Sequence, residues 1–258
     1  MIHLPEISPY IFKIGGIGPT WYGLMYAIGF LIGYQLLKRW SKDYPDWHED
    51  LVSSVLTYII LGVILGGRIG YVFLYHFDLF WQNPFYLFKI TEGGMSFHGG
   101  LLGVIIAMWL FGRKNRLPFL SVTDFIAPAV PPGLFFGRIG NFINGELWGH
   151  ATDMPWAVVF PQDPQQLPRH PSQLYESILE GLVLFVVVYL FARTKPAIGR
   201  VSGLFLIGYS LARFAVEFVR LPDAHIGYMA FGWLTRGQLL TLPMMFFGAY
   251  LLLRKVPR

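Results

Sequence analysis

The apolar positions of this chain fall into seven long runs, separated by shorter polar or aromatic segments. Each run is near the roughly 20 residues that a helix needs to cross the hydrocarbon of a bilayer. None has the two-residue alternation of a membrane strand, and in lipid a helix satisfies its own backbone hydrogen bonds. We therefore predict an all-α polytopic membrane protein with seven transmembrane helices, at Trp21–Leu37, Leu51–Phe73, Met95–Phe111, Phe125–Ile143, Gln173–Phe191, Val201–Phe218 and Gly237–Leu253.

The basic residues predict the orientation of these helices. Four clusters follow the first, third, fifth and seventh runs, so twelve cations share one side if seven spans alternate. Loops rich in Lys and Arg stay in the cytoplasm, which places the C-terminus there and the N-terminus outside. Six or eight spans would scatter the clusters over both sides. The twelve residues are Lys38, Arg39, Lys42, Arg113, Lys114, Arg116, Arg193, Lys195, Arg200, Arg254, Lys255 and Arg258.

Composition supports the membrane assignment. Only 14% of the residues are charged, against about 25% in soluble domains. The net charge of +5 is explained by cationic anchors beside anionic lipid, so nucleic acid is not an expected partner. The chain has no cysteine, which excludes disulfides, thiolate metal sites and a cysteine nucleophile of its own.

We predict a single membrane domain over residues 1–258, with outward segments around 71–94, 147–171 and 221–236. The first is rich in aromatic residues and is expected along the outer interface. The second carries five prolines and is the candidate for a small outward cap.

Glycine and proline patterns concern helix packing. The pairs Gly29/Gly33, Gly62/Gly66 and Gly99/Gly103 have four-residue spacing. This spacing favours close contact between helices over a catalytic role. The run Pro128–Gly133 is expected to interrupt the fourth helix, since proline removes a backbone donor.

Several charged residues lie within or at the ends of the apolar runs. An ionised group in hydrocarbon costs about 2.5–3.5 kcal/mol even on the lenient insertion scale. Such residues must face one another or a wet cavity, and by default they mark a functional site. They are Arg68, Arg138, Arg213, Glu146, Glu176, Glu180 and Glu217.

The sixth run carries the most informative pattern. Tyr209, Arg213 and Glu217 are spaced i, i+4, i+8, so they share one helical face, which Arg220 continues. One interpretation is a structural Arg213–Glu217 pair that joins helices. The alternative is an anion site, favoured because there are more arginines than one pair requires.

Three further motifs add polar groups. Gly137–Gly149 supplies Arg138, Asn141, Asn144 and Glu146 among four glycines, and arginine suits phosphate because its planar fork donates two parallel hydrogen bonds. Gly93–Gly100 contains His98, either a structural histidine or a proton acceptor. In Arg169–Glu176, Ser172 is expected to cap a helix and Pro171 to end the preceding loop, while Glu176 and Glu180 share a face toward the arginines.

These motifs resemble those of the prolipoprotein diacylglyceryl transferase family. Gly137–Gly149 matches the family's signature, and Trp21–Tyr26, Gly93–Gly100, Arg169–Glu176 and Ser202–Tyr209 agree as well. The resemblance covers essentially the whole chain. A short loop between the fourth and fifth helices is the main departure, and it implies a reduced periplasmic cap.

The resemblance implies the reaction and its location. The family transfers the sn-1,2-diacylglyceryl group of phosphatidylglycerol to the lipobox cysteine of a preprolipoprotein signal peptide and releases glycerol phosphate. The implied location is the bacterial inner membrane, with the active site facing the periplasm and no metal or organic cofactor. By the same resemblance, the functional positions are Tyr22, His98, Arg138, Asn141, Glu146, Gly149, Arg213 and Glu217.

We combine both lines of argument into one hypothesis. Arg138 and Arg213 hold the phosphate, Asn141 orients it, Glu146 and Glu217 hold the guanidiniums, and His98 takes the thiol proton. The catalytic set is thus His98, Arg138 and Arg213. The predicted substrate-binding residues are Tyr22, Arg68, Asn141, Asn144, Glu146, Gly149, Tyr209, Glu217 and Arg220.

Two other functions remain as alternatives. In a transporter or flippase, the buried charges would line a path for an anionic lipid or solute. Such proteins often show inverted repeats and paired broken helices, whereas this sequence shows one clear break and no repeat. A structural membrane scaffold is the third alternative, and it does not explain so many charges at one depth.

Overall fold

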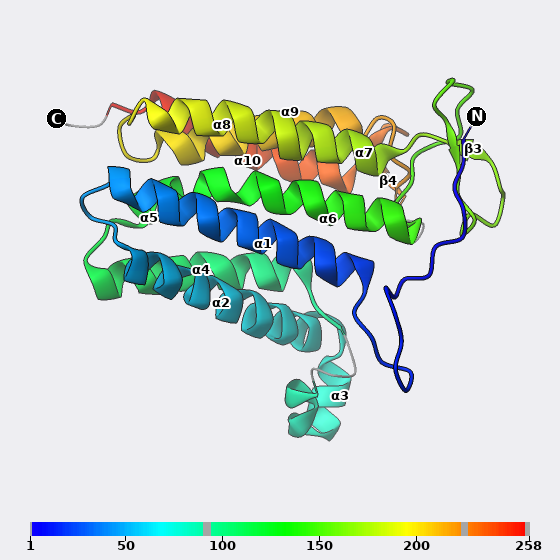
Figure 1. The fold of residues 1–258 in the computed structure, drawn as a ribbon, viewed down its shortest axis with the longest axis horizontal. Coiled ribbons are helices and arrows are strands. Elements are labelled where there is room, and N and C mark those ends of the chain that lie inside the picture. Colours follow the sequence, from blue (N-terminus) through cyan, green and yellow to red (C-terminus); the bar gives the residue numbers. More distant parts are fainter. Residues whose placement is uncertain (1, 90–93, 223–226, 256–258) are drawn as a thin grey trace. The chain divides into compact units, whose positions relative to one another are not determined.

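The computed structural model describes residues 2–89, 94–222 and 227–255. Gly93 and Arg258, which belong to patterns noted above, lie outside this description. The chain is mostly helical, and each of the seven predicted apolar runs is helical (Figure 1). The corresponding elements are α1 (Trp21–Trp40), α2 (Glu49–Tyr75), α4 (Phe97–Asn115), α5–η4–α6 (Phe119–Ile126, Ala127–Ala129, Val130–Asn144), α7–η5–α8 (Ser172–Glu176, Ser177–Val183, Leu184–Arg193), α9 (Arg200–Val216) and α10 (Arg236–Leu253).

Four helical stretches in the described part of the chain are long and apolar enough to cross a bilayer. They are Glu49–Tyr75, Phe119–Asn144, Ser172–Arg193 and Arg236–Leu253. This result confirms an α-helical membrane protein. The count of seven spans, their orientation and the single-domain organisation stay predictions.

The chain divides into two compact units, which we describe separately. The first unit contains residues 1–35 and 126–258, and the second contains residues 36–125. The described residues of the second unit also include three short helices: η1 (Ser41–Asp43) before α2, and α3 (Phe77–Gln82) and η2 (Pro84–Phe88) after it.

The predicted interruption of the fourth run is a short 3₁₀ turn. It occupies Ala127–Ala129, and the helix resumes as α6 with Pro131 and Pro132 in its first turn. Proline is tolerated there because the first N–H groups of a helix have no partner within it. Helical backbone therefore continues through the proline run.

A small sheet forms in the segment predicted as the cap. Strand β1 (Ile2–His3) pairs in parallel with β2 (Val158–Val159), which pairs antiparallel with β3 (Pro168–Arg169). Two further short strands, β4 (Tyr228–Ala230) and β5 (Leu234–Thr235), form a hairpin before α10. The N-terminal strand thereby fastens the chain start to the loop between α6 and α7.

Glycines bring α2 and α4 into direct contact in the second unit. A methyl group added at Gly66 would lie 2.4 Å from the Gly99 carbonyl oxygen, and one at Gly62 would lie 2.6 Å from the Gly103 carbonyl oxygen. A larger residue at either position would force the helices apart. The packing interpretation of these glycines is confirmed.

Candidate functional site

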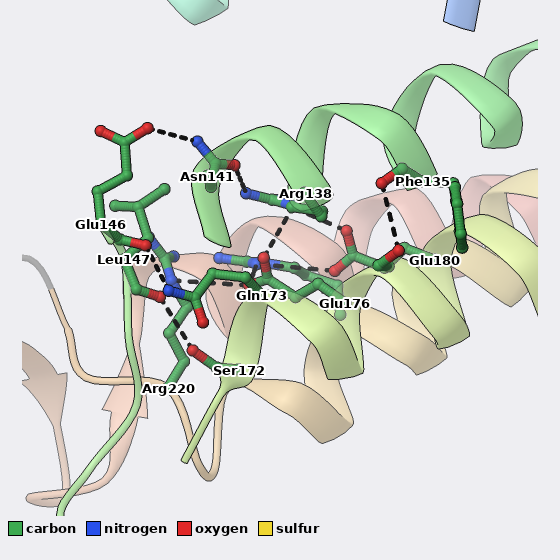
Figure 2. Close-up of polar contacts among 12 residues, drawn as sticks. Phe135, Arg138, Asn141, Glu146, Leu147, Ser172, Gln173, Glu176, Glu180 and Arg220 are labelled. Carbon is green, nitrogen blue, oxygen red and sulfur yellow. Dashed lines mark hydrogen bonds and ion pairs between the residues drawn. The ribbon is translucent and has the colours of Figure 1, made fainter. Parts of the chain in front are cut away.

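Two arginines from different helices meet at one carboxylate in the first unit. Glu176, at the end of α7, is fully buried. Its Oε2 lies 2.8 Å from Nε of Arg138 on α6, and its Oε1 accepts a hydrogen bond from Nη1 of Arg213 on α9. Figure 2 shows Arg138 and Glu176 converging from α6 and α7. The carboxylate therefore bridges two guanidiniums.

Glu217 and Arg220 extend this charged cluster at the end of α9. Glu217 accepts from Nη2 of Arg213, from Nη1 of Arg220 at 3.3 Å, and from the Thr235 hydroxyl. Nε of Arg220 also lies 3.7 Å from Glu176 Oε1. The predicted Arg213–Glu217 pair is confirmed, but it is one part of a larger network.

Glu180 completes the cluster from the π-helical segment η5. It is fully buried, and its oxygens lie 3.6 Å from Nη2 of Arg138 and 3.6 Å from Nη1 of Arg213. The expected pairing of Glu176 and Glu180 with the arginines is thus confirmed. Among the described residues the cluster holds three guanidiniums (Arg138, Arg213, Arg220) and three carboxylates (Glu176, Glu180, Glu217). Such a network is stable only while each charge keeps its partners.

The polar residues of the signature motif form a chain of contacts beside Arg138. Its Nη1 lies 3.5 Å from Asn141 Oδ1, while Asn141 Nδ2 donates to Glu146 Oε1 at 2.8 Å. Asn144 Nδ2 reaches the same Glu146 oxygen at 3.4 Å. The prediction that Glu146 itself holds a guanidinium is wrong, because Glu146 accepts hydrogen bonds from Asn141 and Asn144. Asn141 lies between Glu146 and Arg138, and Glu176 pairs directly with Arg138.

Gly149 lets three backbone segments meet next to the cluster. Its N–H donates to the His170 carbonyl at 2.9 Å, and it forms a bridge with Arg220. An added methyl group would lie 2.4 Å from the Val219 carbonyl oxygen. The missing side chain at Gly149 lets the protein's own backbone approach closely. That approach holds Arg220 in place.

Two buried side chains at the start of α7 bind the backbone of Glu146 and Leu147, in the loop that follows α6. The Ser172 hydroxyl donates to the Leu147 carbonyl at 2.9 Å, so the predicted helix-capping role of Ser172 is wrong. Gln173 is fully buried and donates from Nε2 to the Glu146 carbonyl at 2.6 Å. The role of Gln173 was not predicted, although a glutamine in the first turn of an apolar run was the available signal.

Thr235 was also missed. Its hydroxyl donates to Glu217 and also accepts from the Gln238 N–H, in a capping box at the start of α10. The signal was a Thr followed three residues later by Gln at the start of an apolar run. The helix cap thus doubles as a support for the cluster.

Two predicted tyrosines flank the cluster within the first unit. Tyr22, on the first turn of α1, packs against Gly140 on α6. A methyl group added at Gly140 would lie 2.9 Å from the Tyr22 ring. The Tyr22 hydroxyl is 3.1 Å from that of Tyr26. Tyr209 lies one turn before Arg213 on α9 and stacks on Phe205.

His98 and Arg68 belong to the second unit. His98 is exposed on the first turn of α4, which Ser96 caps by accepting from the Gly99 N–H. Arg68 is buried on α2, where Nε donates to the Leu87 carbonyl at 3.0 Å and Nη2 to the Tyr86 carbonyl at 2.6 Å. Their predicted roles at the substrate stay predictions.

The loop between α6 and α7 carries its own electrostatic pair. Arg169 donates to Asp163 through Nε at 2.6 Å and Nη2 at 3.1 Å. The hydrogen bonds from Arg169 hold the pKa of Asp163 below its usual range. Burial lowers the pKa of His150 and of His170, with smaller contributions from Arg169 and from His150 respectively.

Comparison with known proteins identifies close relatives. A family model described as "Prolipoprotein diacylglyceryl transferase" matches residues 9–254. The chain is 56% identical over 251 residues to the phosphatidylglycerol--prolipoprotein diacylglyceryl transferase of Idiomarina loihiensis, covering 97% of this chain and 94% of the relative. It is 54% identical over 253 residues to the enzymes of the same name from Nitratidesulfovibrio vulgaris strain DP4 (98% and 96% covered) and Legionella pneumophila strain Corby (97% and 98% covered).

Proposed function

The chain belongs to the prolipoprotein diacylglyceryl transferase family, and we propose that its reaction takes place at the Arg138–Arg213 pair. The chain is a membrane transferase that moves a diacylglyceryl group from phosphatidylglycerol to a prolipoprotein. We assign the lipobox cysteine thiol of the signal peptide as the acceptor and glycerol phosphate as the leaving group.

The bridging position of Glu176 carries this proposal. Its two oxygens each face a guanidinium, one from α6 and one from α9. The two non-bridging oxygens of a phosphodiester present the same chemistry, and arginine binds them through parallel N–H groups. The phosphate of the lipid is thus assigned to the donors of Arg138 and Arg213, with Asn141 beside them as an orienting amide.

The arginines act on the leaving group. The sulfur attacks the glyceryl carbon, the C–O bond to phosphate breaks, and the electron pair leaves with the phosphate oxygen. Negative charge therefore grows on the phosphate in the transition state. Donors fixed in advance toward that oxygen stabilise the transition state more than the bound lipid, which raises the rate.

His98 is assigned to the thiol proton. A free cysteine has a pKa of about 8.5 and is mostly protonated at neutral pH, so a base is required. Substitution of His98 by Gln tests this role in the purified enzyme. Substantial turnover with an unchanged pH profile would leave His98 a structural role, and the arginines would then have to activate the thiol electrostatically.

The proposed topology has seven spans in the bacterial inner membrane. The N-terminus, the cap and the active site face the periplasm, while the C-terminus is cytoplasmic. Because the chain contains no cysteine, single-cysteine variants report topology without background. A membrane-impermeant maleimide should label Asp153→Cys in intact spheroplasts and Lys114→Cys only after permeabilisation. The reverse pattern would refute this orientation.

One assay tests the function itself. Purified protein is incubated with phosphatidylglycerol and a lipobox peptide, and the cysteine is examined by mass spectrometry. A mass gain of one diacylglyceryl group is expected. Movement of lipid between leaflets without a new covalent bond would instead indicate a flippase, and neither result would leave a scaffold.

A further inference from the structure

Glu180 is a buried carboxylate that the proposed mechanism does not use. It is fully buried, and neither of its oxygens takes part in a hydrogen bond. Its closest cationic nitrogens, on Arg138 and Arg213, are 3.6 Å away. Glu176, one turn earlier, lies closer to the same two arginines: its Oε2 is 2.8 Å from Arg138 Nε, and its Oε1 accepts from Arg213. The two carboxylates therefore share partners but are held very unequally.

The fold keeps Glu180 from moving closer to the arginines. It lies in the π-helical segment η5, and such segments are frequent at functional sites. The Ser177 hydroxyl donates to the Phe135 carbonyl at 3.2 Å, and a methyl group at Gly181 would lie 2.6 Å from Phe135 Cβ. Figure 2 shows Phe135 on α6 next to the segment that carries Glu180. These contacts fix η5 against α6 on both sides of Glu180.

The charges of the cluster limit what else can bind there. The three arginines and three carboxylates described above balance when all are ionised. The phosphodiester of phosphatidylglycerol adds one negative charge. An unbalanced charge in a buried site carries a large desolvation cost, so binding favours the loss of charge from one carboxylate.

Glu180 is the group best placed to lose its charge. Arg138 faces it from α6 and Arg213 from α9, and a guanidinium stays charged. Glu176 faces it from α7 and has the closer contacts with both arginines. Tyr209 on α9 interacts with it electrostatically and is a neutral hydroxyl. Helix α8, which continues η5, carries its charged residue at its far end.

We propose, on the basis of the proposed function, that Glu180 takes up one proton from solution when the lipid phosphate binds between Arg138 and Arg213. It is a positioning residue, because it acts through the arginines and not on the reacting atoms. Its neutralisation keeps the pocket balanced and frees both guanidiniums to turn toward the phosphate. Lipid binding is thereby coupled to pH.

Calorimetry on the full-length protein in detergent tests this coupling. Dihexanoyl-phosphatidylglycerol is titrated in buffers of different ionisation enthalpy, which reports the protons taken up per lipid bound. Wild type is expected to take up about one proton per lipid bound. Its Kd for the lipid should rise about tenfold for each unit of pH increase, in the range where Glu180 is ionised before binding and protonated after it. Glu180→Gln keeps the shape of the protonated acid and should show neither effect.

Glu49→Gln is the matched control. Glu49 is an exposed carboxylate in the first turn of α2 that pairs with Lys38 and has no predicted role at the substrate, so its loss should leave the proton uptake intact. No uptake in wild type, or uptake that persists in Glu180→Gln, would overturn the proposal. Should Glu180→Gln fail to fold, infrared difference spectroscopy of wild type decides: a protonated-carboxyl band must appear on lipid addition, and its absence counts against Glu180.

The transfer assay separates this proposal from the proposed function. Wild-type protein that forms the thioether on the lipobox peptide but takes up no proton disproves only the role of Glu180. Wild-type protein that forms no thioether disproves the function on which that role rests.

Discussion

Arg138 and Arg68 both interrupt apolar runs, yet the two units surround them with different partners. Arg138 in the first unit faces carboxylates, at 2.8 Å from Glu176 and 3.6 Å from Glu180. Arg68 in the second unit donates to the backbone carbonyls of Tyr86 and Leu87, and the Tyr86 ring lies 4.9 Å from its guanidinium. The same side chain is thus held by exchangeable anions in one place and by the backbone in the other.

The difference indicates that the two arginines have different roles. A carboxylate that pairs with arginine has the chemistry of a phosphate, so a lipid phosphate can take over its guanidinium donors once the added negative charge is neutralised. Carbonyl groups belong to the chain, and releasing them would open the segment that they hold. Arg68 therefore holds η2, the short helix that contains Tyr86 and Leu87. The surroundings of Arg138 are instead suited to binding a phosphate.

The largest effect is expected when the guanidinium fork is removed from the first unit. Arg138→Lys and Arg213→Lys keep the charge but lose the parallel donors, and each should lower kcat/KM by at least about 100-fold. Membrane insertion should be normal. The transfer assay measures this loss, with Arg113→Lys as the control on a predicted cytoplasmic anchor. Near wild-type turnover of Arg138→Lys would remove that residue from phosphate recognition.

Gly149→Ala tests whether backbone contact supports the cluster. The methyl group would lie 2.4 Å from the Val219 carbonyl oxygen and 2.8 Å from His170 Cβ. Overpacking of this kind costs about 1–3 kcal/mol, so both the unfolding temperature and the transfer rate should fall. At Gly133 an added methyl group meets nothing within 4 Å, and Gly133→Ala is the matched variant. Equal effects of both variants would mean that the crowding at Gly149 is relieved elsewhere.

Much of this organisation could be predicted from the sequence. Six of the seven apolar runs locate their helices to within a few residues, because helix length and hydropathy are local properties. The fourth run was predicted to begin at Phe125, whereas α5 already begins at Phe119. The four-residue glycine spacing predicted close helix packing, but not which helices meet. The cost of burying charge likewise predicted that Arg138, Arg213 and Glu217 would take part in one site.

The partners within the site could not be predicted. Sequence spacing shows which side chains share a helix face, but not which face of another helix they meet. Glu146 was therefore assigned to a guanidinium that Glu176 holds, and Ser172 was assigned to a cap although it donates to Leu147. The π-helical segment around Glu180 packs against Phe135 on α6, and the spacing of residues along the sequence shows neither the π-helix nor this contact.

Arg68→Lys gives a moderate effect of a different kind. The variant loses the donation from Nε to Leu87 or from Nη2 to Tyr86, and a hydrogen bond from a charged group contributes about 1.5–3 kcal/mol. Hydrogen exchange of residues 85–89 should accelerate accordingly, while the affinity for phosphatidylglycerol changes less than in Arg138→Lys. An affinity loss as large as that of Arg138→Lys would make Arg68 a substrate-binding residue, as predicted from the sequence.

The smallest effect concerns the pH dependence of the stability of the loop between α6 and α7 in the first unit. The pKa of His150 and that of His170 are lowered by burial, so the folded loop binds fewer protons than the unfolded loop. Its stability is complete above the ordinary histidine pKa of 6.5 and falls as the pH drops below it. The pKa of Asp163 is also lowered, and this contribution is lost only at more acid pH, below the ordinary value of 3.8. Hydrogen exchange of residues 149–170, corrected for intrinsic rates, should therefore rise a few-fold from pH 7 to pH 5, while that of α2 and α4 stays constant. A uniform rise in both units would mean that the histidines do not set the acid response, since the second unit lacks this pair.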